Sequence, residues 1–159
     1  NSYVMNIIYD LNKYKNSQLF FLDTKKNMVM DGNFTKLLYS DRIITVIGLF
    51  FRVNFANTVI HTINNKHILK FDNCSANQKT VALLSTIEKD ILNYYATLFQ
   101  CNKKKTMLLG DYLSNGSIKV YLKNKVKNDT NYIIKISGVW ENENEIGITY
   151  KLLEAETLG

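Results

Sequence analysis

The chain alternates between short segments with a two-residue hydrophobic period and one long segment with a helical period. The alternation is longest at residues 42–55, where the odd-numbered positions form one mostly apolar face. Gly48 interrupts this stretch, as is typical of a bulge or a barrel corner. Because successive side chains of a strand point to opposite faces, Phe50 and Phe51 cannot both be in the core. We therefore expect one long, interrupted strand with one exposed ring.

Shorter segments with the same period are separated by turn-forming residues. Asp31-Gly32-Asn33 and Asn64-Asn65-Lys66 are typical of tight turns. In the last hairpin, an acidic turn at 141–145 joins two strands with one apolar face. The pattern predicts further strands at residues 19–22, 28–30, 58–63, 67–71, 117–123, 131–140 and 146–153.

Residues 76–99 have a helical period instead. Ser75 followed by Gln78 matches a capping box at the start of this helix. Two cysteines, Cys74 and Cys101, flank the helix, and its length of about 36 Å at 1.5 Å per residue argues against a disulfide between them. The predicted apolar stripe consists of Val81, Leu84, Ile87, Ile91, Tyr94 and Leu98.

The order of these elements predicts a mainly β fold with one major helix. Three strands, the helix and two strands follow one another, preceded by an extra N-terminal hairpin. A five-stranded Greek-key barrel with a helix between strands 3 and 4, the OB-fold, has this order and commonly binds single strands or oligosaccharides. We expect an N-terminal arm or short helix at residues 1–16 and a single OB-like nucleic-acid-binding domain at 17–159.

Composition adds a preference for a polyanionic partner. The 159 residues carry a net charge of +6, with ten Tyr and eight Phe. No apolar run is long enough to span a membrane, and no signal-peptide pattern is present at the N-terminus. Two cysteines form neither a disulfide framework nor a metal cluster, which indicates a reducing, intracellular setting.

Catalytic motifs are absent from the sequence. It has no glycine-rich phosphate loop, no zinc-type cysteine pair and no nucleophile elbow. Glu141, Glu143 and Glu145 are interpreted as a solvated turn in preference to a cation site. His61 and His67 are interpreted as structural residues, because no third ligand accompanies them. We expect a protein that is not an enzyme and that uses no metal and no cofactor.

Cations and aromatic rings share the polar faces of several predicted strands, and single-strand binders combine these two features. In the strand at 117–123, Lys119, Tyr121 and Lys123 alternate with apolar residues. The predicted basic groove consists of Arg52, Phe50, Lys103, Lys104, Lys105, Lys119, Tyr121, Lys123, Lys135, Trp140, Thr149 and Lys151.

A plainer interpretation exists for each kind of residue. The lysines can serve solubility alone, Tyr121 can pack against a neighbouring side chain, and Trp140 can anchor the core.

The C-terminal segment resembles the single-stranded DNA-binding proteins of the bacteriophage T7 type and their relatives in large eukaryotic DNA viruses. The resemblance covers roughly residues 40–153 and is most specific in Lys135-Ile136-Ser137-Gly138-Val139-Trp140 and Gly147-Ile148-Thr149-Tyr150-Lys151. It implies an OB-fold that coats single-stranded DNA in viral replication or recombination, at a viral replication site or in the host nucleus. It also implies contacts with a polymerase or helicase. The acidic tail typical of the phage proteins is not found in residues 154–159.

We therefore expect sequence-independent binding of single-stranded DNA, with RNA left open and homo-oligomerisation possible through the N-terminal arm. The alternative is a non-enzymatic protein–protein interaction module of a viral replication or transcription assembly. A carbohydrate-binding β-domain is a third, weaker interpretation.

Overall fold

A computed structural model describes residues 10–15, 18–26, 32–40, 45–122 and 131–155. In chain order the elements are η1 (Leu11–Lys13), β1 (Leu19–Lys26), β2 (Asn33–Ser40), β3 (Thr45–Ile47), β4 (Leu49–Asn54), β5 (Val59–Ile63), β6 (Lys66–Lys70), α1 (Ser75–Leu98), β7 (Lys104–Lys105), α2 (Leu108–Ser114), β8 (Ser117–Tyr121), β9 (Asn131–Glu141) and β10 (Glu145–Glu154).

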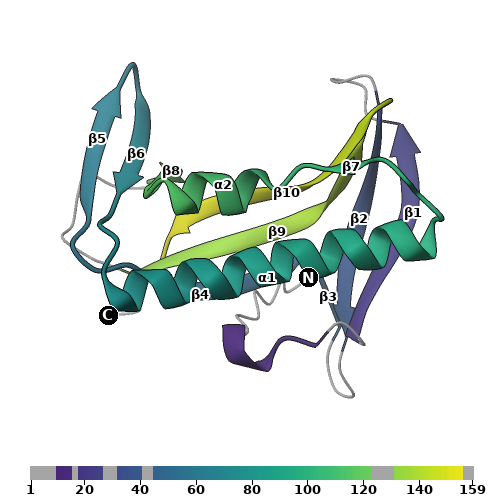
Figure 1. Cartoon of the computed structure of the whole chain (residues 1–159), viewed down its shortest axis with the longest axis horizontal. Coiled ribbons are helices and arrows are strands. Elements are labelled where there is room, and N and C mark those ends of the chain that lie inside the picture. Colours follow the sequence, from purple (N-terminus) through teal and green to yellow (C-terminus); the bar gives the residue numbers. More distant parts are fainter. Residues whose placement is uncertain (1–9, 16–17, 27–31, 41–44, 123–130, 156–159) are drawn as a thin grey trace, which may run out of the picture.

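The strands form one mixed sheet in the order β1-β2-β9-β10-β8-β6-β5. In addition, β3 pairs with β2, β4 with β9 and β7 with β10. The pairings of β10 with β7 and β8 are parallel, and the others are antiparallel. Figure 1 shows the β5–β6 hairpin at one end, β1 and β2 at the other, and β9 and β10 between them. The predicted mainly β class with one major helix is confirmed, as an open mixed sheet.

Gly48 divides the long predicted strand, as its position in the pattern indicated. Its φ of +90° lies in a region that glycine tolerates and other residues rarely adopt. The Gly48 N–H donates to the Leu37 carbonyl at 3.0 Å. Before Gly48 the chain pairs with β2 as β3, and after it with β9 as β4. Phe51 is buried and Phe50 is half-buried on the opposite face, so only one of the two rings lies in the core, as expected, but the other ring is not fully exposed.

The sequence predicted the β5–β6 hairpin more completely than the N-terminal hairpin β1–β2. In the β5–β6 hairpin, Asn64 and Asn65 have φ values of 50° and 64°, as a two-residue turn between twisted strands requires. In the N-terminal hairpin, β1 pairs with β2 at residues 33–40. The partner predicted at 28–30 lies outside the described residues.

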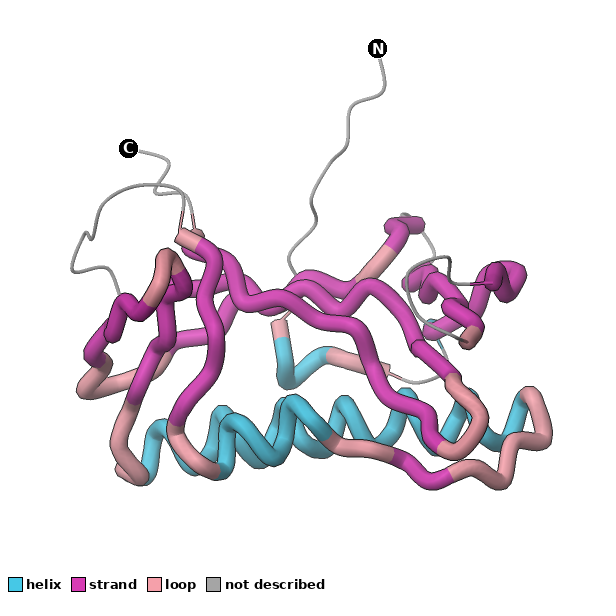
Figure 2. Tube along the Cα trace, turned by 90° about the horizontal axis from the view of Figure 1, so that it is seen from above, coloured by secondary structure: helices cyan, strands magenta, loops and turns pink. Residues whose placement is uncertain are grey.

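Helix α1 covers one face of the sheet, and the described helices all lie on that side (Figure 2). Leu84, Ile87 and Ile91 are buried, as the predicted stripe requires. At the C-terminal end of the helix, Tyr95 is buried in place of Tyr94, and Leu98 is 53% exposed. An α-helix has 3.6 residues per turn, slightly more than the average spacing of the predicted stripe. The predicted positions therefore rotate gradually around the helix, and the last of them no longer face the sheet.

The predicted capping box is wrong. The N-cap residue is Cys74, which makes no side-chain cap hydrogen bond, and the Gln78 side chain donates to the Asn73 carbonyl. The buried Asn77 fixes this end of the helix by a different contact. Its side chain accepts from the Ala56 N–H at 2.8 Å and donates to the Ala56 carbonyl at 2.9 Å.

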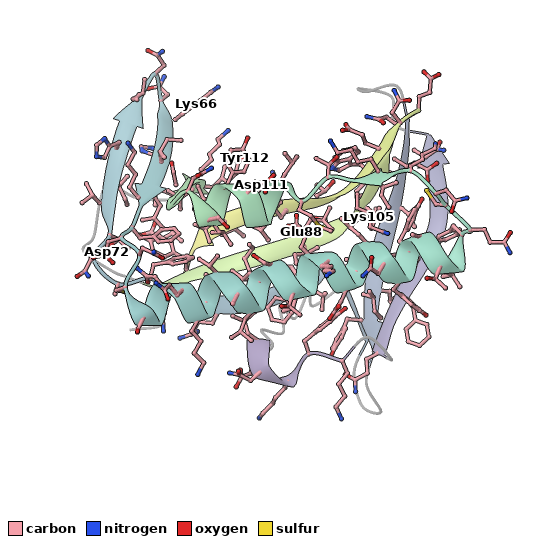
Figure 3. The ribbon with its side chains drawn as sticks, viewed as in Figure 1. Lys66, Asp72, Glu88, Lys105, Asp111 and Tyr112 are labelled. Carbon is pink, nitrogen blue, oxygen red and sulfur yellow. The ribbon has the colours of Figure 1, made fainter. Side chains whose placement is uncertain are left out.

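The short helix α2 was not predicted, and it depends on a buried carboxyl group. Glu88 of α1 is fully buried and accepts hydrogen bonds from the N–H groups of Leu109 and Gly110 at 3.0 and 2.8 Å. These are N–H groups of the first turn of α2, which have no partner inside that helix. Figure 3 shows Glu88 between the two helices. Gly110 permits the close approach, because an added Cβ would lie 3.2 Å from the Glu88 carboxylate and from the Ser85 hydroxyl.

We expect Glu88→Ala to lower the free energy of unfolding by about 1–3 kcal/mol, because buried N–H groups then lack an acceptor. Glu88→Gln keeps an acceptor of similar shape and should cost less. Urea denaturation at neutral pH measures both variants. An unfolding free energy of Glu88→Ala equal to that of the wild type would contradict this assignment.

The same glutamate gives a pH dependence with a defined sign. Burial raises the pKa of Glu88 above its ordinary value of 4.5, against the opposing hydrogen bonds from Gly110 and Leu109. The folded protein therefore holds this proton to higher pH than the unfolded chain does. The part of the stability that is linked to this proton is complete below pH 4.5 and is lost as the pH rises through the raised pKa, separately from the hydrogen bonds to α2. Glu88→Gln should lack this part of the pH profile of stability, and parallel profiles for the two proteins would count against it.

Candidate nucleic-acid interface

The face of the sheet turned away from α1, called the outer face below, carries most of the predicted groove. In β4, β8 and β9, apolar residues on the α1 side are buried and alternate with more exposed residues on the outer side. The structure brings these predicted residues together on the outer face: Phe50, Arg52, Lys119, Tyr121, Lys135, Trp140, Thr149 and Lys151.

Two lysines at the centre of this face lie directly opposite each other. Lys135 of β9 and Lys151 of β10 are cross-strand partners. The Lys135 Nζ lies 5.6 Å from the centroid of the Phe50 ring. The Lys151 Nζ lies 5.0 Å from the centroid of the Tyr121 ring, and the Lys119 Nζ lies 4.8 Å from the same ring. Across β4, β9, β10 and β8 the order is therefore ring, cation, cation, ring, so the two lysines are flanked by Phe50 and Tyr121.

Placing Lys135 opposite Lys151 lowers the stability of the fold, and an anion bound between the two ammonium groups would offset this loss. Like charges directly opposite each other in a sheet are destabilising, and cation–π contacts at exposed sites contribute only about 0.5–1 kcal/mol. Acidic residues on the same face could neutralise this pair of lysines, but the outer positions of the surrounding strands hold none. The residues compared are 33–40 of β2, 49–54 of β4, 66–70 of β6, 117–121 of β8, 131–140 of β9 and 147–153 of β10. The face therefore offers unneutralised positive charge beside accessible rings.

A bulge in β9 determines where Trp140 lies. Thr149 pairs with Gly138 and Tyr150 with Ile136, so Ser137 has no partner in β10. The extra residue reverses the alternation, so Trp140 lies on the outer face and Glu141 on the α1 side. The indole of Trp140 lies over Gly147, where an added Cβ would be 2.3 Å from the ring. Trp140 is thus half-buried on the outer face and is not a core anchor.

The three consecutive lysines predicted at the rim of the groove separate in the structure. The Lys103 ammonium donates to Glu141 Oε2 at 2.9 Å and to the Asn142 carbonyl at 2.8 Å, on the α1 side. Lys104 lies beside Glu145, with an N–O distance of 3.9 Å, and Lys105 is opposite Ile146. Only Lys104 extends the outer face. Lys123 lies outside the described residues.

Glu141 joins the turn to the helix. It accepts a hydrogen bond from the Tyr95 hydroxyl at 3.0 Å in addition to the contact with Lys103. Burial alone would raise the pKa of Glu141, but the hydrogen bonds from Lys103 and Tyr95 and the charge of Lys103 hold it below its ordinary value. Burial and the bond to Glu141 raise the pKa of Tyr95 to about 12. Glu141 is therefore held by Lys103 and Tyr95, so the expectation of a fully solvated turn is wrong for this residue.

The two histidines do not meet. His61 is paired with Ile68 and His67 with Thr62, which places the imidazoles on opposite faces of the hairpin. The His67 Nδ1 lies 2.8 Å from the Thr62 hydroxyl. Within the described residues no three His, Cys, Asp or Glu side chains are arranged to hold a metal ion, and both cysteines are free thiols. No described helix combines the length and the apolar character needed to cross a membrane.

Sequence reasoning missed part of the outer face. Phe34 and Lys36 of β2 extend it beyond β9, and Lys66, Ile68 and Lys70 of β6 extend it beyond β8. The sequence gives no clear signal for β2, because apolar residues occur on both of its faces and Thr35 is one of its buried positions.

Near the centre of the sheet, a cavity of about 570 Å³ opens beside β10. Predicted groove residues and residues of α2 line it together, among them Lys119, Tyr121, Trp140, Leu108 and Tyr112. A second cavity, of about 530 Å³, lies beside Arg52 between η1, β4 and α1. The outer face is therefore bordered by hollows and is not a flat surface.

No family model matches this chain, and no curated protein or solved structure is significantly similar to it. The geometry of the outer face is therefore the basis for any functional assignment.

We expect Gly147→Ala to displace the Trp140 indole, because the new Cβ would overlap the ring. Trp140 is the only tryptophan, so its fluorescence reports the change directly. Emission should shift to longer wavelength and iodide quenching should increase. Thr149→Ala, at the next outer position of the strand, is the control and should leave both unchanged. Emission of Gly147→Ala identical to the wild type would contradict the stacking of the indole on Gly147.

Proposed function

We propose that the outer face binds single-stranded DNA without strong sequence preference. The observation that carries the proposal is the cross-strand pair Lys135–Lys151, which has an aromatic ring beside each ammonium group. Phosphates supply the negative charge that this pair lacks, and exposed rings can stack on bases.

The combination of lysines with exposed aromatic rings favours a single strand over a duplex. In a duplex the base faces are stacked on one another, whereas an unpaired strand presents both its bases and its phosphates. Tyr121 is 40% exposed and lies within about 5 Å of two ammonium groups. A base stacked on this ring would place its flanking phosphates close to Lys119 and Lys151.

The resemblance to viral single-stranded DNA-binding proteins adds a setting to this proposal, namely viral replication or recombination with polymerase or helicase as partners. The predicted OB-type barrel remains part of the proposal as well. The binding face itself does not require barrel closure, because its central contacts lie within β4, β9, β10 and β8.

Salt dependence tests the role of the lysines. We expect a fluorescent oligo-dT of about 30 nucleotides to bind at low salt, with an affinity that falls steeply as salt increases. Replacing one phosphate-contacting lysine should reduce the slope of log K against log salt by about 0.7. Lys151→Gln should show this change, and fluorescence anisotropy measures it.

The matched control is Lys89→Gln, which removes the same charge from an exposed position on α1. It should leave the slope unchanged. Equal slopes for the two variants would assign binding to net charge and not to the outer face. Absence of salt-dependent binding by the wild type would sink the proposal and favour the protein–protein interaction module.

Substitution of Tyr121 tests base stacking. Tyr121→Ala should weaken oligo-dT binding by about 1–3 kcal/mol, the range for loss of one stacked base. Tyr121→Phe keeps the ring and should bind like the wild type. Calorimetry checks that both variants remain folded: Tyr121→Ala should lower the thermal unfolding midpoint only slightly, through the loss of two exposed cation–π contacts, and Tyr121→Phe should not. Unchanged affinity of Tyr121→Ala would remove this ring from the binding path.

A further inference from the structure

The cavity beside β10 occupies a gap in the sheet. On one edge, β10 pairs with β7 at residues 145 and 146 and with β8 at residues 152 and 153. Between these pairings, residues 147–151 pair only with β9 in the part of the chain described. The Ile146 carbonyl points to this edge, because it accepts from the Thr106 N–H at 2.8 Å. By the alternation of a strand, the main-chain groups of Ile148 and Tyr150 point to the same edge.

Aromatic rings from both sides of the sheet surround this gap. Tyr121 and Trp140 lie on the outer side, and Tyr112 of α2 lies on the other side with half of its surface exposed. Figure 3 shows Tyr112 and Lys66 of β6 projecting from two of the elements that border the cavity. The cations that line it are Lys66, Lys119 and Lys151, and no acidic residue lines it.

We propose that this cavity is a nucleobase site, which takes one or two unstacked bases of the bound single strand out of the outer face and into the gap beside β10. The proposal rests on the function proposed above and specifies the path of the strand. It makes Tyr112, on α2, part of a binding site that the outer face alone does not include.

Three features favour a base over another ligand. Rings on opposite sides of the cavity suit a flat aromatic ligand, since base–aromatic stacking needs only an accessible face. The main-chain N–H and C=O groups of Ile148 and Tyr150 can pair with the polar edge of a base. Lys119 and Lys151 belong to the cavity and to the outer face alike, so the backbone phosphates of a strand can stay on the lysines while a base enters.

The volume and position are consistent with this occupant. Small-molecule sites usually measure about 300–1,000 Å³ and combine apolar walls with a few polar groups. At about 570 Å³, the cavity lies within that range. Its lysines would repel a cationic ligand, and its continuity with the outer face gives a strand direct access.

Photo-crosslinking locates the bases directly. The full chain is mixed with an oligo-dT of about 30 nucleotides in which 5-bromodeoxyuridine replaces scattered thymidines, irradiated, digested and analysed by mass spectrometry. We expect a crosslinked peptide that contains Tyr112 in addition to peptides that contain Tyr121 or Trp140 of the outer face. Crosslinks at the outer-face rings Phe50, Tyr121 and Trp140 without Tyr112 would overturn the nucleobase site and leave the proposed function standing.

Filling the cavity provides the affinity test. Leu108 lines the cavity and is partly exposed, so Leu108→Trp should occupy it without removing any lysine. We expect Leu108→Trp to bind oligo-dT roughly 5-fold or more weakly, which corresponds to at least one lost stacked base. The control is Leu98→Trp, at an exposed leucine of α1 remote from the cavity, which should bind like the wild type.

Tyr112→Ala removes a ring without filling the cavity. It should weaken binding by a similar factor, whereas Tyr112→Phe should not. Wild-type affinity of both Leu108→Trp and Tyr112→Ala would refute the nucleobase site. Loss of salt-dependent binding by the wild-type protein itself would instead refute the proposed function, so the two failures are distinguishable.

Discussion

The unpaired Ser137 of β9 is the local constraint on which the rest of the sheet depends. Up to Ile136, β9 pairs with β4, and from Gly138 onward it pairs with β2. The bulge thus lies where the central strand exchanges one neighbour for another. A matching change occurs at Gly48, where the chain stops pairing with β2 as β3 and begins to pair with β9 as β4. Without the reversal of alternation at Ser137, Trp140 would point into the core and Glu141 away from Tyr95 and Lys103.

The two faces of the sheet differ in how their charged side chains are paired. On the α1 side, the charges are satisfied: Glu141 binds Lys103 and Tyr95, and Glu88 binds two N–H groups of α2. On the outer face, Lys135 and Lys151 lie opposite each other, and each ammonium group lies beside an aromatic ring. Such an unbalanced arrangement suits a surface whose charge is completed by a partner.

Residue patterns predicted much of this architecture. The alternation of residues 117–121 and 49–54 was strong enough to assign inward and outward side chains correctly, because each strand buries only one face. Features that depend on distant residues could not be predicted. The short helix α2 requires Glu88 from another helix, and Lys103 is engaged by Glu141, thirty-eight residues further along the chain. The cavity exists only because β7 and β8 pair with different parts of β10, which no local pattern encodes.

The central position of β9 and β10 has a consequence for how the chain folds during synthesis. The hairpins β1–β2 and β5–β6 emerge early, but the strands that connect them span residues 131–154 and are translated last among the described elements. Isolated hairpins are only marginally stable in water. The complete sheet, and with it the full burial of the apolar stripe of α1, can therefore form only after residue 154 has left the ribosome. Long-range pairings of this kind fold slowly and leave intermediates open to aggregation.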